Sequence, residues 1–478
     1  MSANIYTLHA TQAAAEAEQQ RLARMKRAWE AYHGTLPPPF TVTPNGTDDN
    51  VVANKARVIV NKGVSFLFER PIDFELGGDE GADTPAEEYL DRVWQRNRQA
   101  TTLQKLAMNG SVCGHIFVKL VLRPGDVPRL IVLDPAMVSV EWDDADIELV
   151  TRYRVQWTAL DPSTRRPLLR RQVIEPDGPL RWRILDQESG PDGLTWRTTA
   201  TPLWPYPFPP IVDGQNLPLP NEYWGESDLE SDVIDLIIAR SRTLSNLARI
   251  IRFHGHPLTW GKGFSANQLN RSPDNTVVLP SADAELHNLE MVSDLHSHME
   301  YDRRLDEAIH EIARIPAIAT GKVENIGQLS GLAMQILFAP LVEKTETKRS
   351  TYGDFLTELN RRLLILGGYD AEAATPVSIR WPEILPGDPL TERNVALLDK
   401  ELGVSTATLL SQLGYDPERE ATQCADEAAT AQDAQQQSMN AQPMDAMSGQ
   451  VVPGTMQQQQ PGMMGQMGQR MPGMMNNG

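Results

Sequence analysis

The stretch from Ile315 to Gly367 constrains the fold of this sequence most, because a glycine-punctuated loop there runs into one long helix. IPAIATGKVENIGQLSG carries Pro316, Gly321, Asn325, Gly327 and Gly331, which predicts a loop. The following residues repeat apolar side chains at three- and four-residue steps, which predicts a helix of roughly 50 Å. Ser330 is a candidate N-cap, Pro340 predicts a kink and Gly367-Gly368 a stop. Such an element indicates a mechanical part of a large assembly rather than an enzyme core. The apolar positions are Leu332, Ile336, Leu337, Leu341, Tyr352, Phe355, Leu356, Leu359, Leu363 and Leu366.

Composition excludes several classes of protein. The 478 residues suggest about three domains, and 41% hydrophobic residues can fill real cores. A net charge of -19 argues against a simple basic DNA-binding protein and a polybasic membrane binder, but not against a protein that surrounds DNA without gripping it. Two distant cysteines cannot form a disulfide framework, which fits a reducing cytosol. We expect no signal peptide and no membrane span.

The first half of the chain predicts an α+β domain. We expect a solvated helix over residues 10–32, a helix after Asn54, a strand at 72–76 and a helix pair over 86–109 that ends at Gly110. Strands at 115–122 and beyond then form a meander-like antiparallel sheet up to about residue 200. The proline-rich residues 203–222 are too apolar for a flexible linker, so we expect an extended strap on the domain surface.

The middle of the chain predicts two amphipathic helices around a small β-rich segment. The first helix begins near Gly225, with Ser227 or Asp228 as N-cap, and runs to about Phe253. Its first half is acidic and its second half basic, which suits the helix dipole. Residues 254–291 have the pattern of short strands, and a return helix spans 294–315.

After the long helix we expect a strand in TPVSIRW, then two or three short helices separated by Gly403, Gly414 and Pro417. From about Asp433 to Gly478 the chain is rich in Met, Gln, Gly, Pro and Asn. Such a segment buries too little apolar surface to offset its ordering entropy, so we expect disorder there.

No catalytic motif is evident. Gly321-Lys322 is followed by Val323, and Gly261-Lys262 by Gly263, so neither forms a P-loop and NTP hydrolysis is unsupported. Cys113 and His115 have no third catalytic group placed by the sequence, and a buried thiol is the better interpretation.

The sequence signals for metal sites are equally weak. His296, His298 and Glu300 could be written as a ligand cluster, but helix positions two apart do not share a face. The acidic run from Asp143 to Glu148 lacks the spacing and glycine of an EF-hand, so we expect a surface turn.

Basic residues offer possible contacts with nucleic acid. Four arginines share one sector of the first amphipathic helix, and further cations and one amide lie in predicted loops. Each alone is more simply explained as solvated or as part of a salt bridge between subunits, and only a symmetric ring would give these charges collective weight. They are Arg240, Arg242, Arg249, Arg252, Lys262, Arg271, Lys322 and Asn325.

The order of these elements resembles one family. It includes NKARVIVNKGVSFLFERPIDFEL, NGSVCGHIFVKL, DPAMVSVEWDD and WGESDLESDV, then ENIGQLSG leading into the long helix. From about Asn54 to Ala429 this resembles the portal proteins of tailed bacteriophages, of the siphovirus type. No single piece is diagnostic, but their order is specific.

The resemblance implies an α+β portal-type fold with an α/β wing, a two-helix stem, a small β-rich clip, a long kinked helix and a helical crown. It implies a ring, typically of twelve subunits, at one capsid vertex, through which double-stranded DNA is packaged and ejected. Implied partners are the terminase large subunit, head-completion or adaptor proteins, and the major capsid and scaffolding proteins, in the virion and in the host cytoplasm during assembly. No enzyme activity, cofactor, metal or membrane partner is implied.

Carried over by position, the resemblance divides the chain into eight segments. These are a wing (1–224), a first stem helix (225–253), a clip (254–293), a second stem helix (294–314), a tunnel loop (315–331), the long helix with a return strand of the wing (332–387), a crown (388–432) and a disordered tail (433–478).

The candidate site residues follow from these segments. The stem arginines are those named above, and Lys262 and Arg271 lie in the clip, which would dock the terminase and adaptor. We expect the tunnel loop to face DNA through Lys322, Glu324, Asn325 and Gln328. The alternatives are another capsid-associated ring or scaffold protein, or a terminase-type enzyme, which would need a Walker motif or acidic metal ligands.

Overall fold

The structure is a computed structural model of the whole chain and divides into two compact units, residues 1–386 and 387–478. It describes residues 2–425 except 43–45, 77–84, 124, 144, 162–164, 179, 191–194, 256–257, 264–282, 290–294, 322–330, 370–376, 386–388, 414–416 and 418. The predicted disordered tail lies outside the described residues, so that prediction stays untested.

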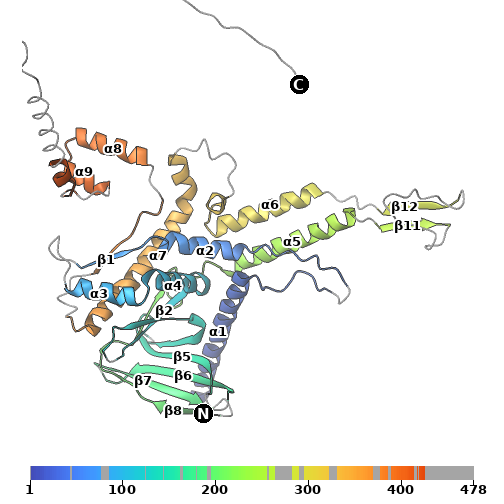
Figure 1. Cartoon of the computed structure of the whole chain (residues 1–478). Helices are drawn as coiled ribbons and strands as arrows, with labels where there is room; N and C mark the ends of the chain where they lie inside the picture. Colours follow the sequence, from blue (N-terminus) through green and yellow to red (C-terminus); the bar gives the residue numbers. More distant parts are fainter. Residues whose placement is uncertain are drawn as a thin grey trace, which may run out of the picture. The chain divides into compact units, whose positions relative to one another are not determined.

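The larger sheet of the first unit is an antiparallel meander in sequence order, as predicted, but it begins at residue 138 (Figure 1). The prediction that the strand at 115–122 belongs to it was wrong, because that strand pairs in a separate sheet. A further short strand pairs with β7. Tyr153 and Val155 on β5 and Ile174 on β6 are buried. The strands are β4 (Val138–Trp142), β5 (Val150–Leu160), β6 (Pro167–Pro176), β7 (Trp182–Ser189), β8 (Trp196–Ala200) and β9 (Leu203–Trp204).

A second, three-stranded sheet has the order β10-β2-β3. Its strands are β2 (His115–Val121), β3 (Arg129–Leu133) and β10 (Ile211–Gln215), and the short helix η1 (Pro135–Met137) follows β3. The predicted surface strap thus contains a core strand, because Ile211 and Val212 on β10 are buried against β2. The expectation of an extended segment was right, and its placement wholly on the surface was wrong.

Four helices pack around these sheets: α1 (Ser2–His33), α2 (Lys55–Phe68), α3 (Pro85–Arg96) and α4 (Gln99–Cys113). The prediction that α4 ends at Gly110 was wrong, because Gly114 is the residue that takes the left-handed conformation and stops the helix. The expectation that the charges of α1 face solvent was wrong for Arg21. Its guanidinium is buried and donates to the carbonyl oxygens of Pro135 and Val138.

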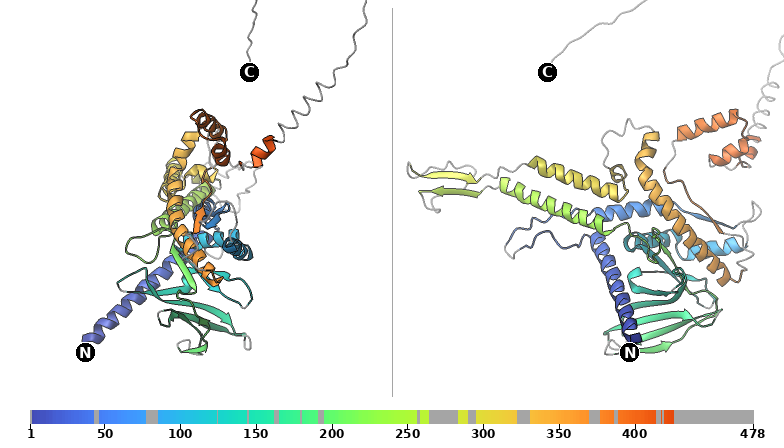
Figure 2. Two further views of the ribbon diagram at one scale, coloured as in Figure 1. Left: turned by 90° about the vertical axis from the view of Figure 1, so that its left-hand side faces the viewer. Right: turned by 180° about the vertical axis from the view of Figure 1, so that it is seen from behind.

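The two middle helices are α5 (Ser231–Gly255) and α6 (Leu295–Ile312), which lie side by side (Figure 1 and the right-hand view of Figure 2). Between them, β11 (Leu258–Lys262) and β12 (Glu285–Leu289) pair as the predicted small β-rich segment. Helix α5 begins later than predicted, because Ser227 and Asp228 are bonded to α4. The Asp228 amide donates to the Ser111 carbonyl, and the Ser227 hydroxyl donates to the carbonyls of Ser111 and Val112.

The long helix is α7 (Gly331–Leu366), which contains Pro340 and bends in its N-terminal part, as predicted (Figures 1 and 2). The short helix η3 (Ala317–Thr320) precedes it, and Ser330 lies outside the described residues. The apolar stripe of α7 has a buried part and an exposed part. Tyr352, Leu356 and Leu359 are fully buried in the core, whereas Ile336 and Leu337 are exposed.

Strand β13 (Val377–Arg380) then pairs antiparallel with β1 (Asp73–Leu76), which joins residues some three hundred positions apart. Helices and separate sheets in one unit confirm the α+β class. The second unit contains α8 (Pro389–Glu401) and α9 (Thr406–Gln412), in agreement with the predicted short helices. Ser405 caps α9, with its hydroxyl accepting the Thr408 amide at 3.2 Å.

Candidate functional site

The predicted stem helices are joined by a buried cluster of charges near the core of the first unit. Arg240 on α5 bonds to Asp302 at 3.0 Å and to Asp306 at 2.5 Å, both on α6. Lys55 on α2 reaches Asp306 at 2.7 Å and the His310 Nε2 atom at 3.2 Å. Arg240 therefore joins α5 to α6, Lys55 joins α2 to α6 at the same aspartate, and the charge of Arg240 is neutralised within its own chain.

Two further arginines of α5 are paired in the same way. Arg252 and Arg249 lie 2.8 Å and 3.6 Å from the carboxylate of Asp49, and the Arg249 guanidinium also stacks on Phe40. Arg242 is exposed. The four arginines predicted as one basic sector thus differ in their surroundings, and Arg242 is the most accessible of them.

The predicted clip contributes an ion pair and an aromatic stack across its two strands. The Lys262 ammonium lies 3.0 Å from the Glu285 carboxylate. Trp260 stacks on His287 with ring centroids 5.0 Å apart and keeps half of its surface exposed. Arg271 lies outside the described residues.

Most of the predicted tunnel loop also lies outside the described residues. This applies to the four residues expected to face DNA: Lys322, Glu324, Asn325 and Gln328. The described start of the loop is a short helical turn, η3, closed by Gly321 with a φ of +83°.

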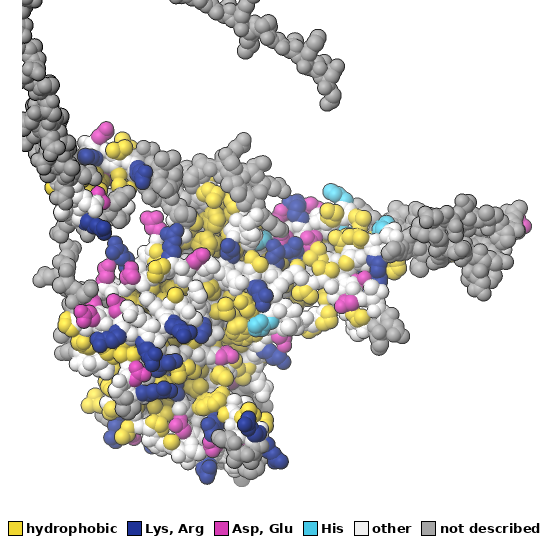
Figure 3. Space-filling view, in the orientation of Figure 1, with side chains coloured by type: hydrophobic (Ala, Val, Ile, Leu, Met, Phe, Trp, Pro, Cys, Tyr) yellow, Lys and Arg dark blue, Asp and Glu magenta, His cyan; other side chains and the backbone are white. Residues whose placement is uncertain are grey.

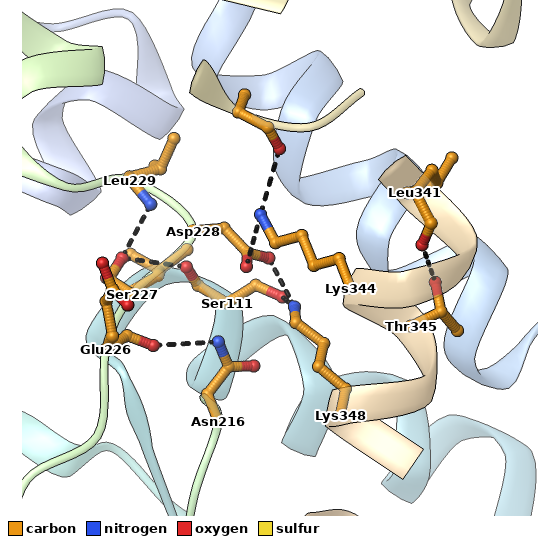
Figure 4. A network of polar contacts seen from close by, with 12 residues as sticks. Ser111, Asn216, Glu226, Ser227, Asp228, Leu229, Leu341, Lys344, Thr345 and Lys348 are labelled. Carbon is orange, nitrogen blue, oxygen red and sulfur yellow. Dashed lines mark hydrogen bonds and ion pairs between the residues drawn. The ribbon is translucent and has the colours of Figure 1, made fainter. Parts of the chain in front are cut away.

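A cluster of buried charges that sequence reasoning missed lies where α7 meets the start of α5 (Figure 4). The carboxylate of Asp228 lies 2.6 Å from the Lys348 ammonium and 3.0 Å from that of Lys344. Lys348 also donates to the Ser111 hydroxyl at 3.1 Å, and Lys344 to the Ala313 carbonyl at 3.2 Å. One turn of α7 is thereby bonded to α4, to the segment before α5 and to the segment after α6.

Burial and charge act in opposite directions in this cluster. Burial alone would raise the pKa of Asp228, but the ammonium groups of Lys344 and Lys348 outweigh it and hold that pKa well below its ordinary value. Burial lowers the pKa of Lys348 to about 8, although Asp228 acts in the opposite direction. The carboxylate is therefore firmly ionised and binds two cations from one helix.

Asn216 extends the polar network beside the cluster. Its side-chain amide donates to the Glu226 carbonyl at 3.0 Å (Figure 4). Its side-chain oxygen accepts the Tyr352 hydroxyl at 3.2 Å. The Ser227 hydroxyl accepts the Leu229 amide at 2.9 Å, and the Glu230 carboxylate accepts the Ser227 amide at 3.0 Å. The segment before α5 is thus fixed at every residue from 226 to 230.

A second, largely buried carboxylate, that of Asp213 on β10, keeps 16% of its side-chain surface exposed. It accepts the hydroxyl groups of Tyr153 at 2.6 Å and Tyr223 at 2.5 Å, and the His115 Nε2 atom lies 3.2 Å away. Burial alone would raise the pKa of Asp213, but His115 and then the two tyrosines lower it below the ordinary value. The carboxylate is a structural acceptor that joins the two sheets.

The remaining chemical candidates have simple structural explanations. Cys113 is buried, and burial raises the pKa of its thiol to about 12, so it is a core residue, as expected. Asp143 and Glu148 lie in the turn between β4 and β5, also as expected. Among the described residues, no group of three or more His, Cys, Asp or Glu side chains could hold a metal ion.

The model of the family described as "Phage portal protein, SPP1 Gp6-like" matches residues 8–163 and 226–434. The two matched ranges cover most of the chain. This chain belongs to the SPP1 Gp6-like family of phage portal proteins. No curated protein matches it.

Membership in the portal family gives the function in outline. Portal proteins are structural components of the capsid that form the channel for genome packaging and connect head to tail, and they are not enzymes. The family implies an oligomeric ring at a capsid vertex, the passage of DNA, and association with capsid and terminase proteins. In the described part of this portal protein, none of the helices has the length and apolar character to cross a membrane.

Proposed function

We propose that twelve copies of this portal protein form the ring, with α5 and α6 as the stem, residues 254–293 as the clip and residues 388–432 as the crown. The surface of α5 and α6 carries this proposal. Large apolar side chains on these two helices are exposed in the single chain: Ile251, Met299, Tyr301 and Ile312. Such side chains on adjacent helices favour a surface that another protein covers, and a neighbouring copy would cover it in a ring.

The charges of the chain suit a conduit that does not grip DNA. Many phosphate contacts would make binding strong and salt-dependent, which would oppose movement of the duplex. The chain carries a net charge of -19, and Arg240, Arg249 and Arg252 are neutralised by its own carboxylates. We therefore assign Arg242 as the stem arginine most accessible to DNA. The tunnel loop (315–331) would supply the DNA-facing residues Lys322, Glu324, Asn325 and Gln328.

The clip is the proposed docking site for the terminase large subunit during packaging and for a head-completion or adaptor protein afterwards. The half-exposed Trp260 is a suitable anchor for a partner, because aromatic side chains are enriched at the centres of interfaces. Lys262 and Arg271 would add charge beside it. The wing (1–224) would contact the major capsid and scaffolding proteins, and assembly would take place in the host cytoplasm.

The mass and shape of the purified full-length chain test the ring. A dodecamer has a mass of about 640 kDa, twelve times the 53.2 kDa of one chain. Light scattering should report this mass, and negative-stain images should show closed rings with a channel at least as wide as a DNA duplex, about 20 Å. The double variant Ile251→Glu/Met299→Glu should lose the rings. Leu203→Glu, at a residue 89% exposed on the wing, is the matched control and should keep them.

A chain that stays monomeric at all concentrations would contradict the ring. Rings that form but do not restore packaging, in a phage whose own portal gene has been deleted, would favour another capsid-associated ring protein. Trp260→Ala tests the clip separately, because it should keep the rings and reduce co-purification of the terminase large subunit. Unchanged co-purification would contradict the assignment of Trp260.

A further inference from the structure

Four cations from three elements surround a hollow of about 380 Å³ on the wing. Arg96 is the last residue of α3, and Arg129 is the first residue of β3. Arg98 immediately precedes α4, and Lys105 lies in the first half of that helix. We name these four residues the basic hollow. Over the strands of the first unit, Lys and Arg side chains lie with Asp and Glu side chains among them (Figure 3), whereas the residues that line the hollow include no carboxylate. This surface contrasts with the net charge of -19 carried by the whole chain.

The floor of the basic hollow is rigid. Asn97 is buried, and its side-chain amide donates to the carbonyls of Val93 at 2.8 Å and Pro128 at 2.9 Å. Its side-chain oxygen accepts the Leu130 amide at 2.9 Å. One side chain thus fixes the turn between α3 and α4 against the start of β3, so the backbones that carry the four cations keep their spacing.

The cations of the basic hollow have little compensation within the described part of the chain. No carboxylate is among the residues that line the hollow. Asp126 lies 3.8 Å from Arg96, but both side chains are substantially exposed, and such a pair contributes little. Arg98, Lys105 and Arg129 are exposed. Like charges that line one hollow repel one another, and an anion bound between them would relieve this repulsion.

We propose that the basic hollow is a phosphate site that binds the backbone of double-stranded DNA, in addition to the channel. Guanidinium groups match the oxygens of a phosphate with paired hydrogen bonds, and the hollow presents three of them with one ammonium. A duplex offers phosphates in a continuous row, so it can also occupy the hollows of neighbouring copies. The site requires no residue of the stem, the clip or the tunnel loop.

Closed circular DNA separates this site from the channel, because a closed duplex cannot thread a ring that is already assembled. The wild-type protein should bind a relaxed minicircle. The triple variant Arg98→Gln/Lys105→Gln/Arg129→Gln should bind it at least about tenfold more weakly. The slope of the logarithm of its affinity against the logarithm of the salt concentration should be shallower by up to about three.

The matched control removes the same charge elsewhere on the wing. Lys26, Arg181 and Arg197 are 79%, 63% and 81% exposed, so their replacement by Gln costs three cations without disturbing the core. This control should bind the minicircle as the wild type does. Equal losses in both variants, or no loss in either, would overturn the proposal. A triple variant that binds DNA normally but fails to bind capsid or scaffolding protein would also overturn the proposal. The hollow would then be a site for an acidic protein partner.

Lysine footprinting tests the site in the unaltered protein. The minicircle should protect Lys105 from acetylation and leave Lys26 reactive. Protection of Lys105 by inorganic phosphate as well would mean that the hollow takes single phosphate groups, and protection by DNA alone would mean that it needs the polyanion. An unprotected Lys105 in the presence of saturating DNA would refute the proposal. A chain that forms no rings would contradict the proposed function and leave this test intact.

Discussion

Asp228 and Lys348 form an ion pair of 2.6 Å across 120 residues of sequence, and neither side chain has more than 2% of its surface exposed. Lys344, one turn earlier on α7, approaches the same carboxylate at 3.0 Å. The segment that leads into α5 is thus held to the long helix by charge. Since α5 is a proposed stem helix and α7 leads back to the tunnel loop, this junction connects the two parts that would surround DNA.

Asp228→Asn should destabilise the protein by about 3–5 kcal/mol, because it leaves two buried ammonium groups without their counter-charge. Lys348→Met should cost less, because Lys344 still neutralises the carboxylate and Met fills a similar volume. Urea unfolding of the purified chain measures both. Lys26→Met, at a side chain 79% exposed, should have little effect. A loss for Asp228→Asn no greater than that for Lys348→Met would show that charge compensation is not what the junction provides.

The order of helices and strands could be predicted because periodicity and turn residues are local signals. The meander, the paired middle helices, the bend in α7 and the strand after it follow from such signals. The buried junction could not be predicted in this way. Asp228 stands where an N-cap is expected, and nothing local distinguishes a solvated cap from an aspartate that meets two lysines 116 and 120 residues away.

One signal could have indicated the junction. The apolar stripe of α7 lapses between Leu341 and Tyr352, and Lys344 and Lys348 occupy that gap one turn apart on the same helix. Charged residues within an otherwise apolar stripe indicate a buried partner of opposite charge. For the stem arginines, the prediction failed in the opposite sense, because a charge expected at the surface is buried and paired. Their spacing suggested a basic surface, but Arg240 pairs with aspartates of a helix that follows some sixty residues later.

Gly110→Ala should destabilise the protein by about 1–3 kcal/mol, because the added methyl group would collide with the hydroxyl of the fully buried Tyr352. Gly353→Ala is the matched control, since its methyl group would meet nothing within 4 Å and Ala favours a helix interior. Its expected effect is a gain of about 0.5–1 kcal/mol. Thermal unfolding should therefore shift in opposite directions for the two variants, and shifts in the same direction would contradict this account of α4 and α7.

Acid should destabilise the protein partly through Asp213. Its pKa in the folded state lies below the ordinary value, so the unfolded chain binds more protons as the pH falls. The stabilisation is fully present above the unfolded pKa of about 3.9 and is lost as the pH falls through the folded pKa. Asp213→Asn should be less stable than wild type at neutral pH and should lose less stability between about pH 5 and pH 3. Urea unfolding across this range measures the slope, and a slope as steep as that of the wild type would rule out this role.

Arg240→Met should loosen the proposed stem, because Asp302 and Asp306 would lose the guanidinium that holds α6 to α5. We expect a loss of about 2–4 kcal/mol in local stability, which hydrogen exchange of the α6 amides would report as faster exchange. Arg242→Met, two residues away at an exposed position, is the matched control and should leave exchange unchanged. DNA retention by assembled rings should respond to the other variant, Arg242→Met, because Arg242 is the exposed arginine. Arg242→Met would change the salt dependence of DNA retention by rings if Arg242 faces the channel, whereas equal exchange in both variants would show that the buried arginine does not hold the helix pair together.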